Sequence, residues 1–137
     1  MTVIADTGAL YALIDASDAW HKRVAAWWVN NAAPVVVPIT VLPELTYLVA
    51  TRIGPHAECA VVRAVADGEF AIEEVVQEDW ASTAALMERY SDLALGFVDA
   101  SVVVMAERLE AWQVLTTDRR HFSAIRSSKG RALQLAP

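Results

Sequence analysis

Four acidic residues stand where apolar runs end or where helices are expected to begin, namely Asp6, Glu44, Asp99 and Asp118. In an open parallel α/β sheet, ligands bind in the crevice beyond the carboxyl ends of the strands. Carboxylates and water are the ligands that suit Mg²⁺ or Mn²⁺. Carboxylates crowded together without a cation would repel one another, and at least one pKa would rise. The four acids therefore predict a divalent-cation site and phosphodiester cleavage by a metal-activated water.

Each of these acids also has an ordinary structural explanation. An Asp at the end of a strand commonly caps a helix or forms a turn. Asp99 would interact with the positive end of its helix dipole, and Asp118 would pair locally with Arg119 or Arg120. Glu44 fits such explanations least well, because its neighbours in the sequence are mostly apolar. The four residues taken together carry the prediction, and no single one does.

Apolar runs and helical periodicities alternate along the chain, as expected for an α/β protein. Short buried strands are expected at 2–5, 35–37, 70–76, 114–117 and 132–135, and helices at 8–14, 19–30, 40–52, 54–67, 79–90, 98–111 and 121–125. Strands interleaved with helices of about ten residues or more indicate a parallel sheet with helices on both faces. We predict a single α/β domain over 1–137, with a central parallel sheet of four to five strands.

The composition restricts the class of protein. No apolar run approaches the ~18 residues that a membrane-spanning helix needs, and the start of the chain lacks the basic region of a secretory signal. Cys59 is the only cysteine, which excludes an internal disulfide and a cysteine-based zinc site. We therefore expect a cytoplasmic protein with no membrane partner.

The net charge of -6 argues against a broad basic surface for nucleic acid. It does not exclude a nucleic-acid enzyme, because cations bound to the acids would cancel local charge and attract phosphate. The apolar share of 55% predicts that part of the surface is covered by another chain.

Four motifs around the acids resemble those of the PIN-domain ribonucleases. These motifs are Asp6–Leu10, Val41–Leu45, Phe97–Val103 and Leu115–Phe122. Their order, their spacing and the length of the chain are similar to those of VapC-type toxins of prokaryotic toxin–antitoxin pairs. The similarity covers essentially the whole chain.

The resemblance implies a PIN-like fold and Mg²⁺- or Mn²⁺-dependent endonucleolytic cleavage of RNA. It implies that the catalytic, metal-binding residues are Asp6, Glu44, Asp99 and Asp118, and the family varies in whether the last acid touches the metal directly or through water. It also implies a homodimer, inhibited by a small antitoxin that occupies the active-site groove. The apolar helices within 40–67 are the expected surface for the second subunit or for an inhibitor helix.

Four further residues are candidates for contacts around the metal or with the substrate. Thr7 and Thr116 would hydrogen-bond a site carboxylate or a phosphate, and Thr116 equally suits an ordinary strand position. Arg119 and Arg120 follow the last acid and would contact phosphate at the mouth of the groove, unless they are merely solvated. For the next residue, His121, a structural role is favoured over that of a general base.

Other chemically notable residues have structural explanations that we favour. Asp92 suits a loop or capping role better than a metal role. Packing in the core or in an interface is favoured over base stacking for the five tryptophans, which are Trp20, Trp27, Trp28, Trp80 and Trp112.

Three alternatives to a ribonuclease toxin follow from the same residues. One is a PIN-fold nuclease that processes RNA without an antitoxin. Another is a non-catalytic binding module that uses the acids only to hold a cation and a partner. A phosphotransfer enzyme with an aspartyl-phosphate intermediate is disfavoured, because the motif Asp6–Gly8 lacks a second acid two residues after Asp6.

Overall fold

The computed structural model describes residues 1–137. Its strands are β1 (Val3–Ala5), β2 (Val35–Pro38), β3 (Ala71–Glu73), β4 (Gln113–Leu115) and β5 (Gln134–Ala136). Its helices are α1 (Thr7–Ile14), α2 (His21–Asn30), α3 (Val41–Arg52), α4 (Pro55–Ala66), α5 (Gln77–Arg89), the short 3₁₀ helix η1 (Ser91–Leu93), α6 (Phe97–Arg108) and α7 (Arg119–Ala124). No helix of the chain combines the length and the apolar character needed to cross a membrane.

The five strands form one sheet in the order β3-β2-β1-β4-β5, and every neighbouring pair is parallel. In the centre, Ile4 lies opposite Val36 on one side and Val114 on the other. The chain winds from β1 through β2 to one edge, then returns to β4 and winds to the opposite edge. The winding direction thus reverses between β1 and β4, and a ligand crevice is expected beyond the carboxyl ends of these two strands. The predicted parallel sheet of up to five strands is confirmed.

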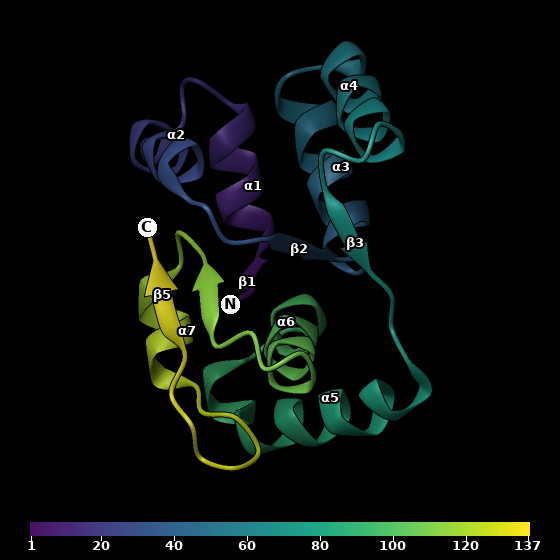
Figure 1. Cartoon of the computed structure of the whole chain (residues 1–137). Coiled ribbons are helices and arrows are strands. Elements are labelled where there is room, and N and C mark those ends of the chain that lie inside the picture. Colours follow the sequence, from purple (N-terminus) through teal and green to yellow (C-terminus); the bar gives the residue numbers. More distant parts are fainter.

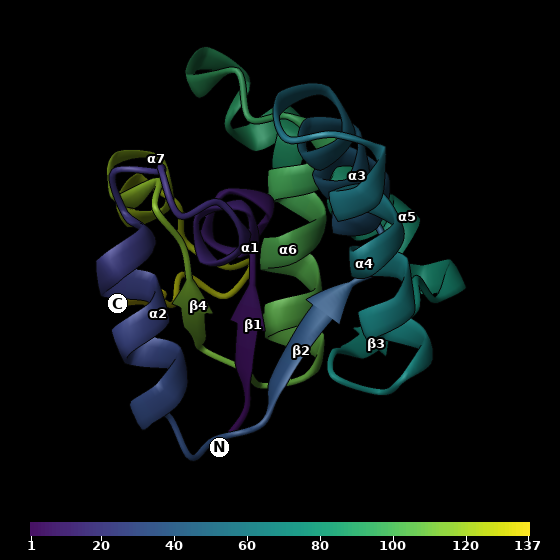
Figure 2. The ribbon, with the colours of Figure 1, turned by 90° about the horizontal axis from the view of Figure 1, so that it is seen from above.

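Helices cover both faces of this sheet (Figure 1). Helices α1 to α4 lie on one side, and α5 and α6 lie on the other. Seen from above, β1, β2 and β4 run side by side, with α6 beneath them (Figure 2). Residues 100–106 of α6 are all buried, because this helix is packed between the sheet and α5. Asp99 directly precedes this buried segment and is itself only partly buried. The packing of α6 therefore holds Asp99 in a fixed position.

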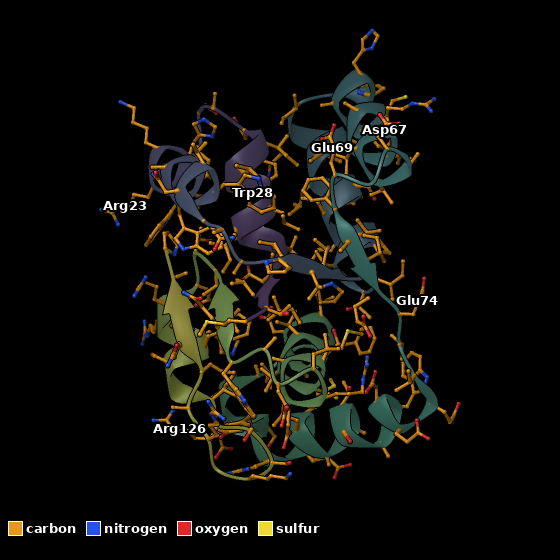
Figure 3. All side chains as sticks on the ribbon, viewed as in Figure 1. Arg23, Trp28, Asp67, Glu69, Glu74 and Arg126 are labelled. Atoms are coloured by element: carbon orange, nitrogen blue, oxygen red, sulfur yellow. The ribbon has the colours of Figure 1, made fainter.

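Most of the tryptophans pack as expected. Trp20, Trp27, Trp28 and Trp112 lie against the hydrophobic core. The Trp28 ring meets Phe70 edge-on, with 5.9 Å between the ring centroids. Trp28 faces the body of the molecule, whereas Arg23 on the same helix projects outward (Figure 3). Trp80 differs, because it is 51% exposed and lies outside this core.

Three predicted helix starts differ by two residues from the observed ones. Helices α5 and α7 begin at Gln77 and Arg119, before the predicted positions 79 and 121. Helix α2 begins at His21, not at residue 19. The Asp18 side chain accepts the backbone N–H of Trp20 at 2.8 Å in a turn that precedes the helix. Thr40 stands at the N-cap position of α3, but its side chain makes no capping hydrogen bond. Its hydroxyl lies 2.6 Å from Ser101 Oγ and so ties the start of α3 to α6.

The other differences concern the ends of elements. β3 has three residues where a strand over 70–76 was predicted, because residues 74–76 run on as an extended link to α5. Helix α6 stops at Arg108 and not at residue 111, since Glu110 adopts a positive φ of 53°. Left-handed backbone of this kind ends an α-helix.

Arg108, the last residue of α6, ties this helix to α5, to the edge strand β3 and to the link between them. Its Nε and Nη2 donate to the two carboxylate oxygens of Asp79 on α5, each at 3.0 Å. Its Nη1 donates to Glu73 of β3 at 2.8 Å, and Nη2 also donates to the carbonyl of Glu74 at 3.1 Å. Glu74 lies on the link between β3 and α5 (Figure 3). Asp79 is only 4% exposed, so Arg108 neutralises a buried charge.

We expect the substitution Arg108→Met to lower the free energy of unfolding by about 2–3 kcal/mol, because it leaves a buried carboxylate without its partner. Urea denaturation of the two proteins measures the difference. Arg63→Met is the matched control, since Arg63 is exposed on α4 and should change stability by less than about 0.5 kcal/mol. Equal stabilities for the two variants would contradict the structural role of Arg108.

Candidate active site and metal centre

Asp6 lies at the carboxyl end of the central strand β1 and caps α1. One of its oxygens accepts the backbone N–H of Ala9 at 2.8 Å. The other accepts the hydroxyl of Thr116, which directly follows the neighbouring strand β4. The carboxylate is therefore held between two strands at the point where the sheet reverses its winding direction. It is almost completely buried, with 4% of the residue exposed.

The environment raises the pKa of Asp6 to about 7. Burial is the main cause, and the hydrogen bonds from Thr116 and Ala9 oppose it. The negative charges of Asp99 and Asp118 add to the increase. An isolated helix cap would not have two further carboxylates close enough to act on its pKa, so capping alone does not account for this residue.

Asp99 lies in the first turn of α6. Its pKa is also raised, first by burial and then by the charges of Asp118 and Glu44, while His121 lowers it. The charges of Glu44 on α3 and of Asp118 after β4 thus act on the pKa of Asp99, and the charge of Asp99 acts on the pKa of Asp6. Residues far apart in the sequence meet around this one side chain.

Asp118 and His121 form the outer side of the group. Asp118 caps α7 by accepting the backbone N–H of His121 at 2.9 Å, and its own N–H donates to Thr116 Oγ1 at 2.9 Å. The Nδ1 atom of His121 lies 3.4 Å from a carboxylate oxygen of Asp118 and 3.8 Å from one of Asp99. The Nε2 atom of His121 is buried without a hydrogen-bond partner.

The structure brings the four predicted acids to one region, but it does not group them equally. Ligand atoms of Asp99, Asp118 and His121 lie within 4.8 Å of one another. Asp6 lies deeper, and Glu44 is exposed on the first turn of α3 at the edge of the group. His121, for which a structural role was favoured over that of a general base, lies within this tightest set. The sequence signal was the position of His121 three residues after Asp118, at the start of a helix. This spacing brings the His121 side chain close to the Asp118 carboxylate.

The four candidates for contacts around the metal or with the substrate lie in different surroundings. Thr116 donates to Asp6, as expected for a residue that orients a site carboxylate. Thr7 is buried, and its hydroxyl has no partner. Arg119 donates to the carbonyl of Pro137 at 2.7 Å, so it is directed toward the C-terminal residue. Arg120 lines a hollow of about 520 Å³ at the mouth of the acid group. The other residues of this hollow are Asp92, Leu93, Asp118, His121 and Ala124.

Gly8 shows how closely the parts of the site approach one another. A Cβ atom at this position would lie 2.7 Å from the hydroxyl oxygen of Thr117, a separation that non-bonded atoms do not adopt. The absence of a side chain therefore lets the first turn of α1 pack against the end of β4. This contact places Asp6 beside Thr116.

The group suits a divalent cation. Carboxylate oxygens are the ligands that Mg²⁺ prefers, and Mn²⁺ also accepts an imidazole nitrogen. Burial raises the pKa values of Asp6 and Asp99, and the charges of the neighbouring carboxylates add to the increase. A bound cation would remove that penalty. The orphaned Nε2 of His121 is a further unused donor or acceptor near the group.

Comparison with known proteins agrees with the geometry. The PIN domain family matches residues 3–127. Ribonuclease VapC26 of Mycobacterium tuberculosis is 38% identical over 135 residues, which cover 98% of this chain and 100% of the relative.

Solved structures show the same fold. VapC20 of M. tuberculosis, described as a sarcin–ricin loop cleaving toxin, superposes with a TM-score of 0.82 at 22% identity, over 89% of this chain and 94% of that chain. A chain of a toxin–antitoxin complex from Klebsiella pneumoniae superposes with a TM-score of 0.70 at 17% identity, over 90% and 92% of the two chains. With the matched sequence and the acids at the sheet edge, these findings place the chain in the PIN-domain family, among the VapC-type ribonuclease toxins.

Proposed function

We propose that the chain is a Mg²⁺- or Mn²⁺-dependent endoribonuclease whose catalytic, metal-binding residues are Asp6, Glu44, Asp99 and Asp118. The observation that carries the proposal is the meeting of Asp99 and Asp118, whose ligand atoms and one of His121 lie within 4.8 Å of one another, beside the buried carboxylate of Asp6. These residues come from three separate parts of the fold, and their mutual repulsion has no structural benefit. Membership of the VapC group favours this function over an RNA-processing nuclease without an antitoxin and over a binding module.

The surrounding residues would keep the acids in place. Thr116 and the N–H of Ala9 orient the two oxygens of Asp6, and His121 lies where it orients Asp99 and Asp118. When bound, the cation would supply activation of a water and neutralisation of phosphate charge. Arg120, at the mouth of the site, would contact a phosphate of the RNA.

A cognate antitoxin and a second copy of the chain are the proposed protein partners. Helices α3 and α4 border an apolar hollow of about 430 Å³ that suits the apolar face of an inhibitor helix. Its lining residues are Ile39, Leu42, Pro43, Thr46, Val61, Val62 and Val65. The similarity to a chain solved within a toxin–antitoxin complex supports such a partner.

Cleavage of RNA with and without divalent metal tests the proposed function. The protein is incubated with a total RNA pool, and with an RNA hairpin that carries a sarcin–ricin loop, in Mg²⁺, in Mn²⁺ or in EDTA. Sequencing of the fragment ends locates the cuts. We expect discrete internal cuts in either metal and a loss of at least about 100-fold in EDTA. Cleavage that persists undiminished in EDTA, or no cleavage in either metal, would overturn the proposal.

A further inference from the structure

Two hydroxyl groups in series join the start of α3 to α6. Ser101 is 3% exposed, and its Oγ donates to the backbone carbonyl of Val98 at 2.6 Å. The same Oγ lies 2.6 Å from Oγ1 of Thr40. Ser101 has a single hydroxyl proton, and the bond to the carbonyl uses it. Thr40 must therefore donate to Ser101, and Ser101 to Val98.

Each end of this link lies beside one of the proposed metal-binding acids. Val98 directly precedes Asp99, so the carbonyl that accepts from Ser101 belongs to the peptide bond leading into Asp99. Thr40 lies one helical turn before Glu44 and on the same side of α3. Thr40, Glu44 and Val98 also border one surface hollow. The link therefore runs from the residue below Glu44 to the backbone that carries Asp99.

Little else connects the two helices that carry these acids. Helices α3 and α6 lie on opposite faces of the sheet (Figure 1). Helix α3 packs mainly against α1 and α4, and α6 packs mainly against α5. No other hydrogen bond or ion pair joins α3 or its cap Thr40 to α6. The separation between Glu44 and Asp99 therefore depends on the hydrogen bond between Thr40 and Ser101.

We propose that Thr40 and Ser101 are positioning residues that set the distance between the carboxylates of Glu44 and Asp99. This role rests on the proposed metal-dependent function and assigns it two residues that act through the acids. Catalytic groups must be held within about 0.5 Å of the productive geometry. A hydrogen bond between hydroxyl groups holds its oxygens about 2.7–2.8 Å apart, and water does not compete for a hydroxyl that is buried, as that of Ser101 is.

Binding of Mn²⁺ in the absence of RNA tests this role. Electron paramagnetic resonance of free Mn²⁺ gives the Kd of each protein, and circular dichroism checks the fold. We expect Ser101→Ala and Thr40→Val each to raise Kd about 5-fold, because each removes one hydrogen bond. The double variant should lose no more than either single one, since both changes break the same link. The control is Thr51→Val, which removes a hydroxyl that bonds only to carbonyls of α3 and should leave Kd unchanged.

Two further variants separate positioning from a general loss of stability. Thr40→Ser keeps the donor and should retain the wild-type Kd. In the Glu44→Gln background, Ser101→Ala should leave the weakened Kd unchanged, because no charge remains at that position for the link to place. An equal rise of Kd in both backgrounds would overturn the proposal, since Ser101 would then not act through Glu44. A lower urea midpoint with an unchanged Kd would indicate a role in stability alone and would also overturn it.

Steady-state kinetics on an RNA that the wild type cleaves complete the test. Misplaced acids slow the chemical step, so we expect Ser101→Ala to lower kcat about 10-fold at saturating Mn²⁺, with KM within about 2-fold of the wild type. A raised KM with an unchanged kcat would overturn the positioning role. A wild type that binds Mn²⁺ no better than Asp99→Asn would overturn the proposed function and this role together. Equal Mn²⁺ affinity in the wild type and both hydroxyl variants would overturn the positioning role alone.

Discussion

Replacing Asp99 with Asn is expected to reduce RNA cleavage by roughly 10³-fold while the protein stays folded. Asn keeps the shape of the side chain but removes the charge that a divalent cation needs. Asp99 interacts with all three other acids, since the charges of Asp118 and Glu44 act on its pKa and its own charge acts on the pKa of Asp6. Initial rates at saturating Mg²⁺ measure the effect, and circular dichroism checks the fold. Activity within tenfold of the wild type would contradict a metal-binding role for Asp99.

The matched control is Asp67→Asn, which removes the same charge from a distant place. Asp67 is exposed at the end of α4 (Figure 3). Glu69→Gln is a second control, since Glu69 is also exposed near that end (Figure 3). We expect both controls to cleave RNA at nearly the wild-type rate. A similar loss in the controls would mean that overall charge, and not the acid group, determines activity.

The stability of the metal-free protein is expected to fall as the pH rises from about 4 to about 7. The pKa of Asp6 rises from an ordinary value of 3.8 to about 7 in the folded protein. In this interval the folded state keeps a proton that the unfolded state has lost, so increasing pH favours unfolding. The total loss from this residue is on the order of 4 kcal/mol. It is absent below the lower pKa and complete above the higher one.

Comparison with Asp6→Asn isolates this contribution. Unfolding of both proteins by urea in EDTA gives their difference in stability at pH 4, 5.5 and 8. As the pH rises across this range, the free energy of unfolding of the variant should increase relative to that of the wild type, because Asn has no charge to bury. Saturating Mn²⁺ should stabilise the wild type more than the variant at pH 8. A stability difference that does not depend on pH would show that the pKa of Asp6 is not raised.

Much of the fold was predictable because its signals are local. The apolar runs at β1 and β4 need no knowledge of the rest of the chain. Asp6 and Asp118 each follow such a run, so their place at the sheet edge was predictable as well. Placing Asp99 and Glu44 beside them required the family resemblance, since nothing local in two helix starts says that these helices meet.

Other features depend on tertiary contacts and were not predictable. The order of the strands follows from how the helix faces pack, so the sequence does not reveal that β1 and β4 are neighbours. His121 joins the acids because α7 turns it back over Asp118 and toward Asp99. Trp80 has the periodicity of a core residue, but α5 lies at the edge of the molecule and leaves it exposed. Thr40 pairs with Ser101 and not with its own helix.

A crystal structure of the protein soaked in Mn²⁺, with anomalous diffraction to locate the metal, tests most directly whether the acids share an ion. We predict an anomalous peak between Asp99 and its neighbours, with carboxylate oxygens of Asp99 and at least one of Asp6 and Asp118 at about 2.0–2.2 Å. The same soak of the Asp99→Asn variant should show no such peak. A wild-type crystal with manganese only at other surfaces, and none among these acids, would contradict the account.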